Sequence, residues 1–251
     1  MCQAMISRDK SMNSAFFSSI VTMDETWMPL FNPETKRQTA QWKHTDSLPP
    51  KKFGVSASAE KMKVAMFWDS EGMILTHCVP KSTTVTGQTY EDVLWTKFLP
   101  ALREKGPKRL QLCSFITTTL LLIGRLVYAS FSTTTTSKFF PHAPYSPDLA
   151  PSDFWLFPTL KDTVRGRIFS SRSALATAIF QWSQRTPKEA FAVAMQSLRQ
   201  HCEKCVRLQG DYVEIWLHFQ LPRVSNFFLI NQETLQLERA RMYYSSLAMS
   251  H

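Results

Sequence analysis

The chain has 251 residues, enough for one large domain with a buried core, and 44% of them are hydrophobic. Its formal charge of +9 favours polyanionic partners such as nucleic acid. The five cysteines are scattered and odd in number, which excludes a secreted module built on paired disulfides, and no signal peptide is evident.

The first predicted elements are a strand, a loop and a hairpin. A short buried strand is predicted at 18–24, ending on an acid. The polar run at 32–53 contains three prolines and predicts a long exposed loop with a basic bias. Two β-prone runs follow at 53–67 and 73–79, and the residues between Asp69 and Gly72 predict the turn of a hairpin.

The later elements are helical. Apolar spacing predicts helices at 86–105, 154–160, 171–184 and 187–208. Thr89 and Asp92 resemble a capping pair for the first of these helices, and Ser152 is the candidate cap of the second. Strands followed by helices predict an α/β domain, a mixed sheet flanked by helices.

The segment 114–124, SFITTTLLLIG, lies where such a sheet needs a further strand. It is β-branched and apolar enough to form one. A membrane-spanning interpretation of 112–131 is disfavoured by Arg125 and by many Ser and Thr, because a spanning helix needs about twenty mostly apolar residues.

Two acids stand out by position. Asp24 closes the first predicted strand and Asp153 opens a predicted helix. Carboxylates at such places can converge on hard divalent cations such as Mg²⁺, which take oxygen ligands. The alternative is that Asp24 is a turn residue and Asp153 an acid favoured by the helix dipole.

The run HCEKC at 201–205 has the spacing of half a zinc site. No second pair of ligands follows, and the run lies within a predicted helix. Two cysteines of an ordinary helix are therefore the favoured interpretation.

Several segments together resemble the mariner family of DNA transposases. They are VTMDETW, NPETKRQTAQWKHTDSLPPKK, MFWDSEGMILTHCVPKSTTVTGQTY, HAPYSPDLAPSDFWLFPTLK and CVRLQGDYVE, in family order between residues 20 and 214. The resemblance implies a ribonuclease-H-like catalytic domain, dependence on Mg²⁺ (or Mn²⁺) and cut-and-paste DNA transposition. In the family three aspartates hold the metals, and the motifs assign the first to Asp24 and the third to Asp153.

In the family, thirty-four residues separate the second aspartate from the third, and the second lies in a motif like HHDNAPAHR. That count leads to Thr118, and the motif is absent from the chain. Read one frame over, the possible codons of residues 115–124 permit all nine residues of the motif in order, with the aspartate straddling Thr117 and Thr118. We therefore predict a frameshift through 108–140, a lost metal ligand, doubtful metal binding here and little or no strand cleavage.

Basic residues form two groups. The loop contributes Lys36, Arg37, Lys43, Lys51 and Lys52, and the stretch after the third aspartate contributes Lys161, Arg165, Arg167 and Arg172. They are candidate contacts to DNA phosphates, weak and without sequence preference, with ordinary solvated surface as the alternative. The resemblance also implies that the loop reaches a partner subunit in a homodimer. We expect the N-terminal modules that recognise element ends to be absent and the interdomain linker to be largely absent.

The expected organisation is an N-terminal remnant at 1–17, a catalytic domain at 18–214 and a tail at 215–251 without assigned role. The resemblance implies a nuclear location and no membrane partner. Two alternatives stay open: a domesticated, non-catalytic DNA-binding or interaction protein, and the conceptual translation of a pseudogene.

Overall fold

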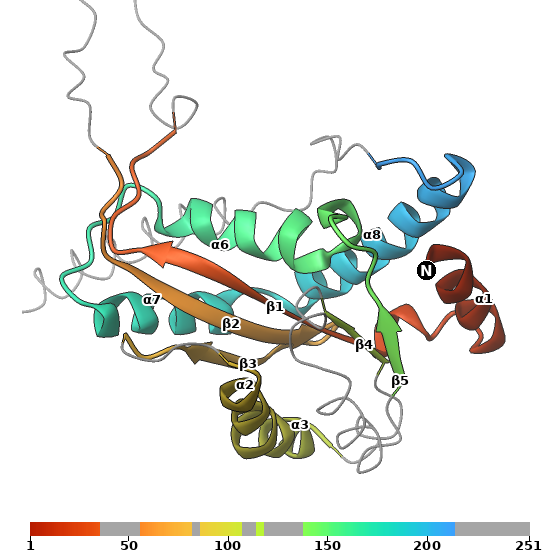
Figure 1. Ribbon diagram of the computed structural model, residues 1–251, viewed down its shortest axis with the longest axis horizontal. Coiled ribbons are helices and arrows are strands. Elements are labelled where there is room, and N and C mark those ends of the chain that lie inside the picture. Colours follow the sequence, from red (N-terminus) through yellow and green to blue (C-terminus); the bar gives the residue numbers. More distant parts are fainter. Residues whose placement is uncertain (36–55, 82–85, 107–113, 118–137, 214–251) are drawn as a thin grey trace, which may run out of the picture. The chain divides into compact units, whose positions relative to one another are not determined.

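The computed structural model describes residues 1–35, 56–81, 86–106, 114–117 and 138–213. Within this part a mixed sheet has helices on both of its faces (Figure 1). No helix among the described residues is long and apolar enough to cross a membrane, and most of 112–131 lies outside them.

The sheet has five strands in the order β3-β2-β1-β4-β5. They are β1 (Ile20–Pro29), β2 (Lys61–Asp69), β3 (Gly72–Cys78), β4 (Ser114–Thr117) and β5 (Lys138–Pro141). The first three pair antiparallel, whereas β4 runs parallel to both β1 and β5. This confirms the predicted α/β class with a mixed sheet.

Strand β1 is longer than predicted. Asp24 does not end it but lies in its middle, opposite Met66, and the antiparallel pairing with β2 continues to Pro29. Buried Thr26 and Met28 extend the alternating pattern beyond the acid, which is why the strand does not stop there.

Strand β4 supplies the predicted further strand. Its four residues pair with β1 from Ile20↔Ser114 to Met23↔Thr117. Residues 114–117, part of the segment predicted to be out of frame, therefore lie next to the central strand β1.

One face of the sheet is covered by a continuous helical segment, α2 (Gly87–Val93), η2 (Leu94–Phe98) and α3 (Leu99–Glu104). Val21 and Met23 of β1 belong to the apolar core on this side, and Phe67 stacks on Phe98 with ring centroids 4.7 Å apart. The predicted helix is confirmed, but its capping pair is wrong. The cap is Thr86, whose Oγ1 accepts a bond of 3.3 Å from the backbone N–H of Thr89.

The other face is covered by η4 (Ser152–Leu156), α6 (Phe157–Val164), α7 (Arg172–Arg185) and α8 (Lys188–Arg207), with two short turns, η1 (Phe17–Ser19) and η3 (Pro147–Leu149), beside them. Trp68 of β2 packs between Trp155 and Phe191, at centroid distances of 5.2 and 5.6 Å. Both long helices at 171–184 and 187–208 are confirmed, and Ser171 caps the first.

Helix α1 (Cys2–Ser11) was not predicted. It packs on α8, with Met5 fully buried. Buried Asp9 accepts a bond from the backbone N–H of Phe16 and pairs with Arg199 at 3.3 Å. Its weakly amphipathic sequence explains the omission, because tertiary packing supplies most of the stability of such a helix.

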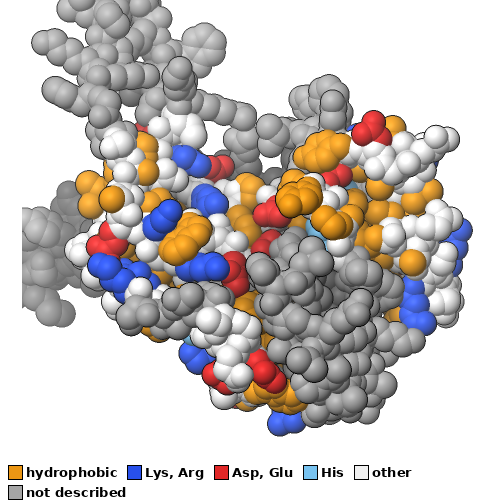
Figure 2. All heavy atoms as spheres, viewed as in Figure 1, with side chains coloured by type: hydrophobic (Ala, Val, Ile, Leu, Met, Phe, Trp, Pro, Cys, Tyr) orange, Lys and Arg blue, Asp and Glu red, His pale blue; other side chains and the backbone are white. Residues whose placement is uncertain are grey.

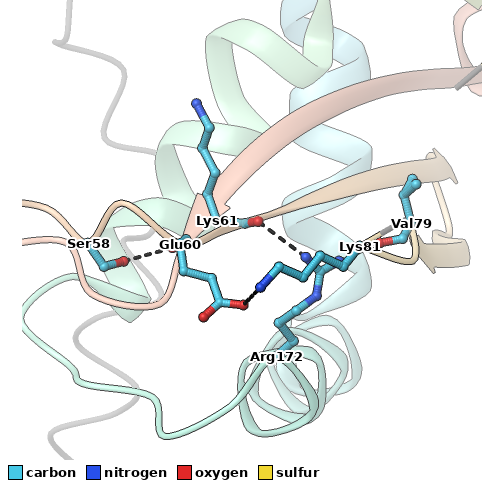
Figure 3. A network of polar contacts seen from close by, with 6 residues as sticks. All are labelled: Ser58, Glu60, Lys61, Val79, Lys81 and Arg172. Atoms are coloured by element: carbon cyan, nitrogen blue, oxygen red, sulfur yellow. Dashed lines mark hydrogen bonds and ion pairs between the residues drawn. The ribbon is translucent and has the colours of Figure 1, made fainter. Parts of the chain in front are cut away.

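Arg172 acts as a structural clamp (Figure 3). Its guanidinium donates to the carbonyl of Val79 at 2.6 Å and to that of Lys61 at 3.3 Å, joining α7 to the end of β3 and the start of β2. A cation in the first turn of a helix is disfavoured by the helix dipole, so these two bonds account for its presence there. The guanidinium that we expected at a phosphate is therefore committed within the fold.

Replacing Arg172 with Ala should lower the free energy of unfolding by about 1–3 kcal/mol, because two strand carbonyls lose a charged donor. Arg172→Lys should recover only part of this loss, since an ammonium lacks the two-pronged geometry. Urea unfolding is the measurement, with Arg103→Ala at an exposed helix position as the control. Equal stability of the Arg172 and Arg103 alanine variants would contradict the clamp.

Candidate catalytic site

Asp24 lies on the face of the sheet that the helix start η4 covers. Side chains alternate along β1, so Asp24 shares the side of Thr22, whereas Val21 and Met23 point to the opposite core. Thr22 stands opposite Trp68, which packs on Trp155 of η4. The carboxylate is buried at 8% exposure, and its Oδ1 accepts a bond of 2.8 Å from the backbone N–H of Glu25.

Asp153 lies in the first turn of η4, and its neighbour connects that turn to the sheet. The indole N–H of Trp68 donates to the hydroxyl of Ser152 at 3.1 Å in a buried bond. Ser152 is therefore not the predicted helix cap; it lies inside the first turn, and its hydroxyl is used by the tryptophan. Since Trp68 stands opposite Thr22, two residues from Asp24, the bond brings the two acids to the same side of the sheet.

The electrostatics of Asp153 are those of a partly desolvated acid. Burial raises the pKa of this carboxyl above its usual value, and the nearby charges of His142 and Lys161 only partly offset the effect. Burial also lowers the pKa of Lys161, against the attraction of Asp153. Keeping Asp153 ionised at neutral pH therefore costs free energy in the folded state, as expected for a carboxylate placed to bind a cation.

His142 is a site residue that our reading of the sequence missed. It directly follows β5, its Nε2 is buried without a hydrogen-bond partner, and it interacts electrostatically with Asp153. Burial lowers its pKa, which favours the neutral ring, while bonds to the backbone of Leu149 and Ala143 act in the opposite direction. The available signal was its position as the first residue of the HAPYSPDLAPSD motif.

The place of the second aspartate is defined by strand register. The described pairing of β1 with β4 ends at Met23↔Thr117, one residue before Asp24 on one strand and one before Thr118 on the other. Thr118 lies outside the described residues. The spacing count and the register thus point to the same neighbourhood.

The described residues contribute two carboxylates to this side of the sheet. Among the described residues no three His, Cys, Asp or Glu side chains are arranged to hold a metal ion. Asp24 and Asp153 would supply two carboxylates to a hard cation, and threonine at position 118 brings no charge. Two divalent ions about 3.5–4 Å apart need more anionic ligands than this to offset their repulsion.

The stretch after the third predicted aspartate is bonded to the residues that precede the predicted basic loop. The backbone N–H of Gly166 donates to the carbonyl of Asn32 at 2.7 Å, and that of Phe169 to Leu30 at 3.0 Å. A side chain at position 166 would collide with Glu34, because a Cβ there lies 2.7 Å from the Glu34 Cγ. The stretch carrying Arg165 and Arg167 is therefore fastened to the base of the basic loop.

The predicted phosphate contacts differ in availability. Arg167 is exposed and lies over the ring of Phe169 at 5.2 Å, while Arg165 pairs with Asp162 at 3.4 Å and is less exposed. The five loop residues, Lys36, Arg37, Lys43, Lys51 and Lys52, lie outside the described residues. Figure 2 shows a group of Lys and Arg side chains on the left of the drawn face, where β1 ends and β2 begins, with acidic side chains beside it towards the centre.

Comparison with known proteins shows which proteins this chain resembles. A family model described as a transposase, partial DDE domain, matches residues 32–112. The mariner Mos1 transposase of Drosophila mauritiana is 28% identical over 218 residues, which cover 85% of this chain and 61% of that protein. The human histone-lysine N-methyltransferase SETMAR is 26% identical over 212 residues, covering 80% of this chain and 29% of that protein. The chain thus spans less than two thirds of the length of either relative.

Solved structures of the Mos1 transposase also match the chain. The paired end complex of Mos1 with Mn matches with a TM-score of 0.74 at 27% identity, over 85% of this chain and 61% of that one. The crystallised catalytic domain of Mos1 matches with a TM-score of 0.67 at 26% identity, over 85% of this chain and 92% of that one. Other Mos1 structures that match contain Mg or a left transposon end.

The near-complete coverage of the isolated Mos1 catalytic domain confirms the expected ribonuclease-H-like fold. The matched segment carries both acids on one face of the sheet and the DETW and YSPDLAPSD motifs in order. The chain is similar to mariner DNA transposases, and its described residues share the fold of the Mos1 catalytic domain.

Proposed function

We propose that the chain is a degenerate mariner transposase whose ancestral activity, cut-and-paste DNA transposition, is lost or nearly lost. The observation that carries this proposal is the incomplete acidic site. Asp24 and Asp153 lie on one face of the sheet, while the residue at the expected second carboxylate is Thr118.

The chemical reason lies in charge. When bound, Mg²⁺ or Mn²⁺ would supply the activation of a water or 3′-hydroxyl and the stabilisation of the leaving oxygen in phosphodiester cleavage. In this chain Asp24 and Asp153 would bind the cation, and Trp68 would hold the helix start through Ser152. A threonine hydroxyl is a weak neutral donor and does not replace a bridging carboxylate.

A pair of compensating frameshifts accounts for the loss. The codons of residues 115–124 permit the missing motif in another frame, and no Asp or Glu occurs between Glu104 and Asp148. The nucleotide sequence across residues 108–140 decides this point. If the other frame does not spell the motif, the frameshift explanation is wrong.

Several finer assignments are part of the proposal. The catalytic domain spans 18–214, the protein acts in the nucleus, and the basic residues at the loop stem contact DNA phosphates without sequence preference. Complexes of the similar Mos1 protein include one with a left transposon end, which supports DNA as the partner. The loop at 32–53 would reach a second subunit, as the family resemblance implies.

A second candidate is a domesticated, non-catalytic DNA-binding or interaction protein. The observation that favours it is the similarity to SETMAR, a histone-lysine N-methyltransferase of which the matched segment forms only 29%. A segment of this kind therefore occurs within a protein named for a different activity. Salt-dependent DNA binding without cleavage would support this candidate.

The first test is strand cleavage. On duplex DNA carrying a mariner terminal repeat, with Mg²⁺ or Mn²⁺, the chain should produce no detectable nick. Thr118→Asp should restore a third carboxylate, so Mn²⁺ should raise its thermal midpoint more than that of the parent chain. Thr119→Asp, which adds the same charge one residue later, is the matched control. Robust cleavage by the parent chain would overturn the proposed loss of activity.

The second test is the pH dependence of stability at Asp153. Its raised pKa means that the folded state binds the proton more tightly, so this contribution to stability is present at low pH and is lost as pH rises through the raised pKa. Asp153→Asn should therefore unfold at a higher temperature than the parent at pH 7, and the difference should vanish well below pH 3.8, the usual pKa. Asp92→Asn at an exposed position is the control. A pH-independent difference would sink the desolvation account.

The third test is the salt dependence of DNA binding. Each phosphate contact contributes a slope of about −0.9 to the logarithm of affinity against the logarithm of salt concentration. Lys51→Ala combined with Lys52→Ala should therefore flatten the slope by about 2 units if both contact phosphates. Fluorescence anisotropy with a labelled duplex measures this, and Lys10→Ala with Lys81→Ala is a control of equal charge change. An identical slope in the two double variants would remove the loop from the interface.

A further inference from the structure

Three thiols from opposite ends of the sequence meet beside the first helix. Cys202 and Cys205 lie three residues apart on α8, and Cys2 lies at the start of α1. The packing of α1 on α8 brings the three together: the Cys202 Sγ lies 4.0 Å from the sulfur of Met5, one turn after Cys2, and Cys2 and Cys205 line the same cavity. The helical interpretation of HCEKC is therefore confirmed, and the third cysteine comes from a helix that the sequence did not predict.

The three thiols differ in access. A cavity of about 580 Å³ is lined by both Cys2 and Cys205, together with Asp148, Tyr145 and Tyr212. Cys202 is fully buried, and its Sγ lies 4.0 Å from the thioether sulfur of Met5. A small polar reagent that enters the cavity can therefore reach Cys2 and Cys205.

The cluster concentrates negative charge on one sulfur. Interaction with the Cys202 thiol is the main cause that lowers the pKa of Cys2 to about 6; the Cys205 thiol acts in the same direction, and burial and Asp148 oppose them. Burial and interaction with Cys2 raise the pKa of Cys205 to about 11. The nucleophile of a thiol cluster is its thiolate, so Cys2 is the reactive member at neutral pH.

We propose that Cys2 is a peroxide-reactive thiol and that Cys205 resolves its oxidised form into a disulfide. The Cys2 thiolate attacks one oxygen of hydrogen peroxide, the O–O bond breaks and hydroxide leaves, so the sulfur becomes a sulfenic acid while the peroxide is reduced. The Cys205 sulfur then attacks the sulfenic sulfur, the S–O bond breaks, and the thiol proton leaves with the hydroxyl group as water.

Cys205 is the resolving thiol for two reasons. It is partly exposed and lines the same cavity as Cys2, whereas Cys202 is fully buried. Interaction with Cys2 and burial also raise the pKa of Cys202, so little of it is thiolate at neutral pH. The resulting bond would tie α1 to α8, which the ion pair of Asp9 with Arg199 already joins.

Tryptic peptide mapping of the oxidised full-length chain tests the assignment directly. Cleavage after Arg8, Arg199, Lys204 and Arg207 places Cys2, Cys202 and Cys205 on three separate peptides. After a brief treatment with hydrogen peroxide and alkylation of the remaining thiols, we expect the peptides of Cys2 and Cys205 to be joined. Their combined mass should fall by about 2 Da, for the two hydrogens lost.

Matched variants separate this pair from other thiols. Cys205→Ser should abolish the cross-link to that peptide, and Cys78→Ser, at a separate cysteine whose pKa burial raises, should leave it unchanged. Cys2 that remains fully alkylatable after peroxide treatment would overturn the proposal. A cross-link from Cys2 to the Cys202 peptide alone would overturn the role of Cys205.

Discussion

The hydrogen bond from the Trp68 indole to the Ser152 hydroxyl is the contact on which the acidic site depends. It fastens the start of η4 to the strand next to β1, so the carboxylates of two remote motifs share one side of the sheet. The surrounding rings of Trp155 and Phe191 exclude water and strengthen that bond. A bond of this kind is costly to break, because the indole N–H would remain buried without a partner.

That arrangement makes the charged form of Asp153 unfavourable in the folded state. Desolvation raises its pKa, and Lys161, itself partly desolvated, compensates only in part. Both acids that could bind a divalent cation are present on this side of the sheet. Functional sites commonly retain such unfavourable charges, and their persistence here agrees with descent from an active enzyme.

Periodicity predicted the regular elements well, because α7, α8 and the β2–β3 hairpin each follow their hydrophobic repeat. Periodicity failed where contacts with residues distant in the sequence decide the extent of an element. The extension of β1 to Pro29 depends on pairing with β2, and α1 depends on packing against α8. Ser152 reads locally as a helix cap, but a tryptophan 84 positions earlier in the chain takes its hydroxyl. Local pattern carries no information about such distant contacts.

The sequence by itself determined the resemblance to mariner transposases, the positions of Asp24 and Asp153, and the threonine at the spacing of the family's second acid, because motif order and spacing are properties of the linear chain. Only the tertiary structure decided that Arg172 clamps two strands, that a nitrogen of His142 is buried without a hydrogen-bond partner, and that Cys2 and Cys205 line one cavity. Each of these joins segments far apart in sequence or sets the burial of a charge. Both depend on how the elements pack, which no local run of residues specifies.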